Sequence, residues 1–184
     1  MTLTETPICN FGEKAKSFDL LSAANKKISL NDIKGENGTL IMFICNHCPY
    51  VKAVVKDIVE DAKYLETLGV KSVAIMSNDV KNYPEDSFEN MLSFSKLHSF
   101  SFPYLIDETQ KIAKEYGAVC TPDFFGYNKN LELQYRGRIR ELKNLKPVGK
   151  GSSDLRIAMQ LIATSGKGPK NQIPSMGCNI KWFK

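Results

Sequence analysis

The feature that most constrains this chain is a Cys-x-x-Cys pair, Cys45 and Cys48, placed where a predicted strand turns into a predicted helix. Residues 40–45 are an unbroken apolar run, which is typical of a strand buried on both faces. Residues 51–68 then repeat apolar side chains at the three-and-four spacing of a helix. The N-terminus of that helix offers N–H groups and a partial positive charge, which favour the reactive thiolate over the thiol. The segment therefore predicts a redox site.

The 184-residue chain has the composition of a soluble globular protein, since 42% of its residues are hydrophobic and 24% are charged. We expect a single domain over residues 1–184, with its core at about residues 11–165 and a C-terminal tail at residues 166–184. The basic residues behind the net charge of +5 are scattered, so no nucleic-acid partner is expected. No apolar run is long enough to span a membrane, and residues 1–10 lack the pattern of a signal peptide. The chain is therefore expected to be cytoplasmic, with no membrane partner.

Strands and helices are expected to alternate after an N-terminal hairpin. The apolar patterns predict that hairpin at residues 17–21 and 27–30, and strands at residues 39–45, 70–77, 103–106, 123–127 and 131–135. They predict helices at residues 51–68 and 85–98, a short helix that ends at Gly117, and a last helix capped by Ser152 or Ser153. Asp107 and Gln110 have the spacing of a capping box, and residues 1–17 are expected to form an irregular arm. This order predicts an α/β fold with a central mixed sheet flanked by helices.

The two thiols have the spacing of a dithiol that closes a small disulfide. The first would lie exposed at the helix cap, and the second one turn on, within reach of a mixed disulfide. His47 lies between them, and an imidazolium beside a thiolate lowers the pKa of the thiol and makes the disulfide more oxidising. A zinc site is the alternative, but the remaining cysteines and His98 form no second pair of ligands. We therefore expect neither a metal nor an organic cofactor.

Three segments together resemble a known family: residues 45–51 (Cys-Asn-His-Cys-Pro-Tyr-Val), residues 120–125 (Cys-Thr-Pro-Asp-Phe-Phe) and residues 175–182 (Ser-Met-Gly-Cys-Asn-Ile-Lys-Trp). They are similar to the thioredoxin superfamily, in its peroxiredoxin-like and thiol-disulfide oxidoreductase branch (alkyl hydroperoxide reductase/thiol-specific antioxidant-like). The resemblance implies a thioredoxin-like fold with an N-terminal hairpin and an inserted βα unit. It also implies that Thr121 and Pro122 form a cis-proline loop that faces the thiols and positions a substrate.

The chain departs from the two branches of that family at specific positions. The tryptophan that precedes the first thioredoxin cysteine is Ile44 here. When Cys48 and Pro49 are aligned with the peroxiredoxin cysteine and its proline, the peroxide-positioning threonine falls at Cys45. Arg136, Arg138 or Arg140 supplies the active-site arginine of peroxiredoxins, or all three are surface charges. The lost hydroxyl favours disulfide exchange over peroxide reduction.

The leading hypothesis is a thiol-disulfide oxidoreductase in which Cys45 attacks a substrate disulfide and Cys48 resolves the mixed disulfide. His47 tunes the thiolate, Pro122 positions the substrate, and a thiol or disulfide protein serves as substrate or reductant. Two alternatives stay open. One is an antioxidant thiol peroxidase with Cys48 as the peroxidatic cysteine, and the other is a non-enzymatic module that binds metal through Cys45 and Cys48. Cys120 and Cys178 are additional redox candidates.

Overall fold

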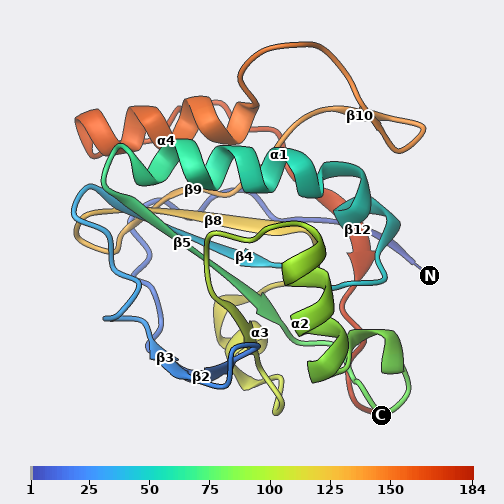
Figure 1. Cartoon of the computed structure of the whole chain (residues 1–184). Helices are drawn as coiled ribbons and strands as arrows, with labels where there is room; N and C mark the ends of the chain where they lie inside the picture. The colour runs from blue at the N-terminus through green and yellow to red at the C-terminus, as the bar shows by residue number, and fades with distance from the viewer. Residues whose placement is uncertain (1) are drawn as a thin grey trace.

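A seven-stranded mixed sheet forms the centre of this computed structural model, which describes residues 2–184 (Figure 1). Its strand order is β3-β2-β6-β5-β4-β8-β9. The middle strands β4, β5 and β6 are parallel, and the strands outside them are antiparallel to their neighbours. The strands are β2 (Asp19–Ser22), β3 (Lys27–Ser29), β4 (Gly38–Phe43), β5 (Val70–Met76), β6 (Tyr104–Ile106), β8 (Asp123–Asn128) and β9 (Leu133–Tyr135). The predicted mixed sheet and N-terminal hairpin are confirmed.

Strand β4 is the central strand, and every residue in it is buried. Its side chains alternate between two apolar cores, with Leu40 and Met42 on one face of the sheet and Ile41 and Phe43 on the other. This two-sided burial explains why the sequence here is a continuous apolar run rather than an alternating one. The chain leaves the carboxyl end of β4 directly toward the Cys-x-x-Cys segment.

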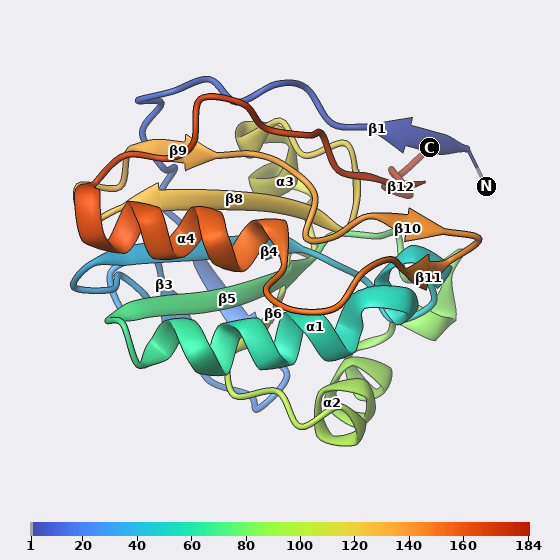
Figure 2. The same ribbon diagram turned by 90° about the horizontal axis from the view of Figure 1, so that it is seen from above.

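Helices cover both faces of the sheet (Figures 1 and 2). They are α1 (Pro49–Glu66), α2 (Phe88–Leu97), α3 (Lys111–Tyr116) and α4 (Asp154–Ser165). Helices α1, α2 and α4 pack into the core on one face, and α3 packs into the core on the other. Pro49 starts α1 at little cost because a first-turn N–H has no partner within the helix. Within residues 2–184, no helix combines the length and apolar character needed to cross a membrane.

The structure also contains a second, small sheet that the sequence did not predict. It has the order β1-β12-β7, from β1 (Leu3–Glu5), β12 (Met176–Asn179) and β7 (Cys120–Thr121). Both pairings are antiparallel. The N-terminal arm and the C-terminal tail therefore each contribute a strand. These two strands pair with each other although they lie near opposite ends of the sequence. A short hairpin of β10 (Leu142–Lys143) and β11 (Lys146–Pro147) also forms between β9 and α4.

The second predicted helix begins later than the sequence indicates. Pro84–Asp86 forms a separate 3-10 turn, and α2 starts only after Ser87, whose hydroxyl accepts from the Asn90 N–H at 3.3 Å. The turn places Asp86 in the interior rather than on a helix surface, because its side chain is fully buried. This displacement creates part of the site described below.

The predicted capping box at Asp107 and Gln110 is half wrong. Asp107 does accept from first-turn N–H groups of α3, those of Ile112 and Ala113. Gln110 instead turns inward with a φ of 61°, and its side chain is buried. Its amide donates to the carbonyls of Ser77 and Lys181 at 2.8 Å each and accepts from the Phe183 N–H at 2.8 Å. Gln110 thus joins the C-terminal segment to the end of β5.

Candidate active site

Cys45 and Cys48 lie between the end of β4 and the start of α1, as predicted, with Cys48 as the residue that precedes the first turn of the helix. The structure buries them, however, because Cys45 is 1% exposed and Cys48 is 0% exposed. Thr121 contacts both: its hydroxyl lies 3.4 Å from Cys45 Sγ, and its carbonyl accepts from Cys48 Sγ at 3.2 Å. The Thr121–Pro122 peptide bond is cis, as the family resemblance implied.

A third sulfur completes the site. Cys178 on β12 lies directly opposite Thr121 in the small sheet, and its Sγ is 3.0 Å from Cys48 Sγ. Residues directly opposite each other in an antiparallel pair share one face, so Cys178 and Thr121 both face Cys48. We call Cys45, Cys48 and Cys178 the thiol cluster.

The thiolate of the cluster belongs to Cys48. The pKa of Cys48 is lowered to about 5, chiefly because the Cys45 thiol donates a hydrogen bond to it, and burial opposes this effect. Cys178, Thr121 and the backbone N–H of Val51 in the first turn of α1 further favour the thiolate. A neutral Cys48 thiol has its acceptor in the Thr121 carbonyl. Several donors therefore converge on one sulfur.

The other two sulfurs of the cluster stay protonated at neutral pH. Burial raises the pKa of Cys45 well above its ordinary value, and hydrogen bonding to Cys48 and the negative charge of Asp86 raise it further. Burial and the hydrogen bond with Cys48 raise the pKa of Cys178 to about 12. One thiolate thus lies beside two thiols, an arrangement that is chemically suited to thiol–disulfide exchange.

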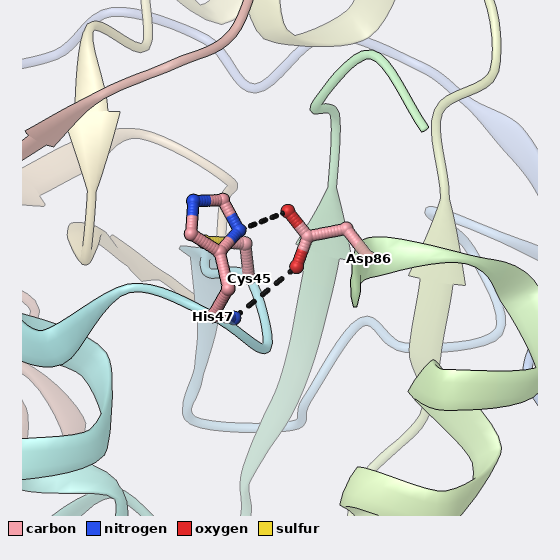
Figure 3. Close-up of side chains that lie close together, drawn as sticks. All are labelled: Cys45, His47 and Asp86. Atoms are coloured by element: carbon pink, nitrogen blue, oxygen red, sulfur yellow. Dashed lines mark hydrogen bonds and ion pairs between the residues drawn. The ribbon is translucent and has the colours of Figure 1, made fainter. Parts of the chain in front are cut away.

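His47 pairs with a carboxylate rather than with a thiol. Its Nδ1 lies 2.7 Å from Asp86 Oδ2, and Figure 3 shows the ring and the carboxylate facing each other with Cys45 behind the ring. The hydrogen bond to Asp86 raises the pKa of His47, against the opposing effect of burial. Tyr83 stacks on the imidazole, with ring centroids 5.7 Å apart and planes 10° apart. His47 is therefore fixed beside the thiol cluster as the hydrogen-bond partner of Asp86.

Asp86 is the site residue that the sequence analysis missed. Its carboxylate accepts from the Asn46 N–H at 2.8 Å, from the His47 N–H at 3.3 Å and from the Asn78 amide at 2.7 Å. It thereby holds the backbone between the two cysteines. A signal was present in the sequence: the segment after β5 must lie near the segment after β4, because carboxyl ends of neighbouring parallel strands share one edge of a sheet.

Residues 11–142 match the AhpC/TSA family, which is most of the chain. The chain belongs to the AhpC/TSA family. An uncharacterized conserved protein from Geobacillus kaustophilus is 39% identical to it, with 100% of this chain and 97% of that chain covered and a TM-score of 0.93. A hypothetical protein from Sinorhizobium meliloti 1021 is 35% identical, with 98% of each chain covered and a TM-score of 0.91. No curated protein matches the sequence.

More distant structures share the fold of this AhpC/TSA family member. A secreted Mycobacterium tuberculosis disulfide oxidoreductase homologous to E. coli DsbE is 17% identical, with 64% of this chain and 80% of that chain covered and a TM-score of 0.54. The predicted thioredoxin-like fold and family resemblance are thus confirmed. Family membership supports a thioredoxin-like redox function that acts on thiols or disulfides.

The arginines that were candidates for the active-site arginine of this AhpC/TSA family member each pair with a carboxylate. Arg136 lies 2.9 Å from buried Asp123 and donates to the Gly117 carbonyl at 2.7 Å. Arg138 pairs with Asp154 of α4 at 2.7 Å, and Arg140 pairs with Asp57 of α1 at 3.1 Å. These ion pairs leave the thiol cluster with donors from cysteine, threonine and backbone instead.

Cys120, the remaining buried redox candidate, has different surroundings. Its thiol donates to the Pro122 carbonyl at 3.7 Å, and burial together with the negative charge of Asp123 raises its pKa. It precedes Thr121 in β7, and successive residues of a strand point to opposite faces. Because Thr121 faces Cys48, we expect the Cys120 side chain to point away from the thiol cluster.

A metal is the alternative occupant of part of this site. One ligand atom from each of Cys45, His47 and Asp86 lies within 4.8 Å of the others. The carboxylate oxygens of Asp86, however, already accept from two backbone N–H groups, from the imidazole and from the Asn78 amide. A cation would have to replace these bonds, which hold the Cys-x-x-Cys segment in place. The hydrogen bonds of Asp86 therefore fit a carboxylate that holds the backbone in place better than one that binds a metal.

Proposed function

We propose that this protein is a thiol-disulfide oxidoreductase in which Cys48 is the attacking thiolate and Cys45 the thiol that resolves the mixed disulfide. The observation that carries the proposal is the low pKa of Cys48 at the start of α1, with the Cys45 thiol hydrogen-bonded to it. This order is the reverse of the one expected from the sequence. The sequence predicts an exposed first cysteine, whereas burial and the charge of Asp86 keep Cys45 protonated.

The proposed reaction exchanges one disulfide for another. The Cys48 thiolate attacks one sulfur of a substrate disulfide, the substrate S–S bond breaks, and the released substrate thiolate takes a proton. Cys45 then loses its proton, attacks Cys48 Sγ in the mixed disulfide and releases the second substrate sulfur as a thiolate, which is protonated in turn. The protein dithiol is oxidised to a Cys45–Cys48 disulfide, and the substrate disulfide is reduced to two thiols. Another thiol protein restores the dithiol by the same steps in reverse.

Neighbouring residues have distinct roles in this proposal. The Thr121 hydroxyl and the first-turn N–H of α1 stabilise the Cys48 thiolate before attack. Asp86 keeps Cys45 protonated until the mixed disulfide has formed, when loss of the thiolate charge on Cys48 makes Cys45 easier to deprotonate. His47 holds the Asp86 carboxylate in place through their hydrogen bond. The charge of Asp86 thus adds to the difference between the pKa values of the two cysteines.

A hollow beside the thiol cluster suits an extended peptide. It is lined by Tyr50 and Pro122 next to the cysteines, and by Ile139, Leu142 and half-exposed Met176 farther out. Apolar side chains bordered by charged groups such as Arg138 and Glu141 are typical of surfaces that bind protein segments. We therefore assign disulfide-bearing polypeptides as the substrate class.

Reduction of a disulfide-linked fluorogenic peptide, with a dithiol as electron donor, tests the assignment of the nucleophile. Cys48→Ser should lower the rate by a factor of at least about 10³, because the attacking group is gone. The double variant Cys45→Ser, Cys178→Ser should instead accumulate a mixed disulfide between Cys48 and the peptide, because no thiol in contact with Cys48 is left to resolve it. Cys120→Ser is the matched control, as another buried cysteine outside the cluster. Full activity in Cys48→Ser would show that the nucleophile is elsewhere.

A thiol peroxidase is the second candidate, and the burial of the cluster favours it. Because Cys45, Cys48 and Cys178 are each 3% exposed or less, a small oxidant reaches them more easily than a polypeptide does. Cys48 would attack peroxide and become a sulfenic acid, releasing water, and a neighbouring thiol would then form a disulfide and release a second water. Trapping with a sulfenic-acid probe distinguishes the two. Rapid labelling of Cys48 after dilute peroxide, with no turnover of peptide disulfides, would replace the leading proposal by this one.

A further inference from the structure

The fold brings a sulfur from the far end of the sequence to the proposed nucleophile. Cys178 Sγ lies 3.0 Å from Cys48 Sγ, although the two residues are 130 positions apart. Both sulfurs lie at the first turn of α1, where the Val51 N–H favours the thiolate of Cys48 and the Tyr50 N–H favours that of Cys178. The end of the helix therefore offers a donor to each sulfur, and so to negative charge on either one.

The position of Cys178 is built into the small sheet. β12 is the middle strand, held by β1 on one side and by β7 on the other. Cys178 pairs with Leu3 and Thr121, and the Ser175 hydroxyl donates to the Pro122 carbonyl at 2.8 Å. Backbone pairing on both sides leaves little freedom for the strand to move away from Cys48.

Gly177 allows this close approach. A Cβ atom at position 177 would lie 2.0 Å from the carbonyl oxygen of Thr121, far inside any real contact. The absence of a side chain lets β12 lie against Thr121, and the next residue then places its sulfur on Cys48.

Cys120 shows that a nearby cysteine is not sufficient. It lies in the same small sheet, opposite Asn179, and it is as fully buried as Cys48. Its thiol donates to a backbone carbonyl rather than to a sulfur. Of these two cysteines of the small sheet, Cys178 is the one in contact with the nucleophile.

We propose that Cys178 is a third redox-active thiol. It competes with Cys45 for a disulfide bond to Cys48, so that the oxidised protein also holds a Cys48–Cys178 disulfide. The proposal rests on the function proposed above, which supplies a disulfide substrate as the oxidant. In a mixed disulfide, Cys178 loses its proton to the departing substrate thiolate, attacks Cys48 Sγ and forms the new S–S bond as the substrate bond breaks. From a Cys45–Cys48 disulfide, the same attack releases Cys45, which takes the proton, and no electrons leave the protein.

Peptide mapping of the full chain tests this directly. Trypsin leaves Cys45 and Cys48 together in residues 35–52 and Cys178 alone in residues 171–181, because Lys34, Lys52, Lys170 and Lys181 flank them. The reduced protein is treated with oxidised glutathione, remaining thiols are blocked in acid, and the peptides are analysed without reduction. We expect residues 35–52 linked to residues 171–181 in the wild type and in Cys45→Ser. The linked pair should be lost completely in Cys178→Ser and in Cys48→Ser.

Two further variants control for structure. Cys120→Ser removes a buried thiol of the same small sheet and should leave the linked pair unchanged. Gly177→Ala keeps all three thiols but forces β12 away from Thr121, so the yield of the linked pair should fall. Absence of the linked pair from the oxidised wild type would overturn the proposal, whatever the variants give.

Failure of this inference and failure of the proposed function give different results. If only the Cys45–Cys48 disulfide forms and peptide reduction still depends on Cys48, then Cys178 has no redox role and the oxidoreductase assignment stands. If the linked pair forms but Cys48→Ser still reduces the peptide at the wild-type rate, the third thiol is supported and the assigned nucleophile is wrong.

Discussion

Cys48 and Cys120 are both completely buried, yet their pKa values are shifted in opposite directions. The pKa of Cys48 is lowered to about 5, whereas that of Cys120 is raised by burial and by Asp123. Cys48 lies at the start of α1 among thiol, hydroxyl and backbone donors, and Cys120 lies within a strand and donates to the Pro122 carbonyl. Burial penalises both thiolates, so the difference comes from the donors around the sulfur. Hydrogen-bond donors, rather than exposure, therefore distinguish these two buried cysteines.

The largest expected effect is the difference between the pKa values of the Cys48 and Cys120 thiols. At pH 7 Cys48 should hold about thirtyfold more thiolate than an ordinary thiol with a pKa of about 8.5. Thiolate absorbance in the ultraviolet should rise as the pH increases through about 5, because the thiol loses its proton there. That step should vanish in Cys48→Ser and persist in Cys120→Ser. A first step above pH 8 in the wild type would remove the contrast between the two regions.

Arg136→Met should show that the region around Cys120 is structural. Asp123 is fully buried, and loss of its ion pair with Arg136 leaves a charge without compensation, which costs about 3–5 kcal/mol of unfolding free energy. Urea unfolding at pH 7 measures this cost. The pKa of Asp123, already raised to about 6 by burial, should rise further, so the loss should shrink as the pH falls and the carboxyl becomes neutral.

A matched substitution sets the scale for that loss. Arg138→Met breaks the ion pair with Asp154, which is 45% exposed, and should cost less than about 1 kcal/mol. Equal stabilities for Arg136→Met and Arg138→Met would contradict the structural role of the buried pair. The thiolate step of Cys48 should stay at its wild-type pH in both variants.

The smallest expected effect is that of one donor at the reactive sulfur. Thr121→Val keeps the shape of the side chain but removes the hydroxyl that lies 3.4 Å from Cys45 Sγ and stabilises the Cys48 thiolate. Since the other donors remain, the pKa of Cys48 should rise by about one unit. Thr164→Val, on the exposed face of α4, is the control. An unchanged thiolate step in Thr121→Val would mean that the thiols and the helix suffice.

The sequence predicted the elements whose burial leaves a pattern within the element itself. The apolar run of β4 and the apolar stripe of α1 were readable because each follows from burial of that element alone. The strands β1 and β12 were not, because they are short, partly exposed and paired across almost the whole sequence. Nothing in a three- or four-residue segment indicates a partner so far away.

The candidate site was likewise predictable where its residues are close in the sequence and not where they are far apart. Cys45 and Cys48 were predicted from their spacing and from the strand-to-helix transition, both of which are local. The contact of Cys178 with Cys48 depends on the register of β12 against Thr121, which no sequence pattern encodes. The partner of His47 was missed because a helix was expected to begin at Glu85, which would have placed Asp86 on its surface.

Gln110 has a consequence for the dynamics of the segment that carries Cys178. Its buried side chain bonds the carbonyls of Ser77 and Lys181 and the N–H of Phe183, so it anchors the segment that follows β12 to the end of a central strand. Amides of β12 should therefore exchange with deuterium at the slow rate of the sheet rather than at the fast rate of a fraying segment. An opening that moves the segment after β12 has to break these three hydrogen bonds, whereas an opening that leaves β12 in place keeps them.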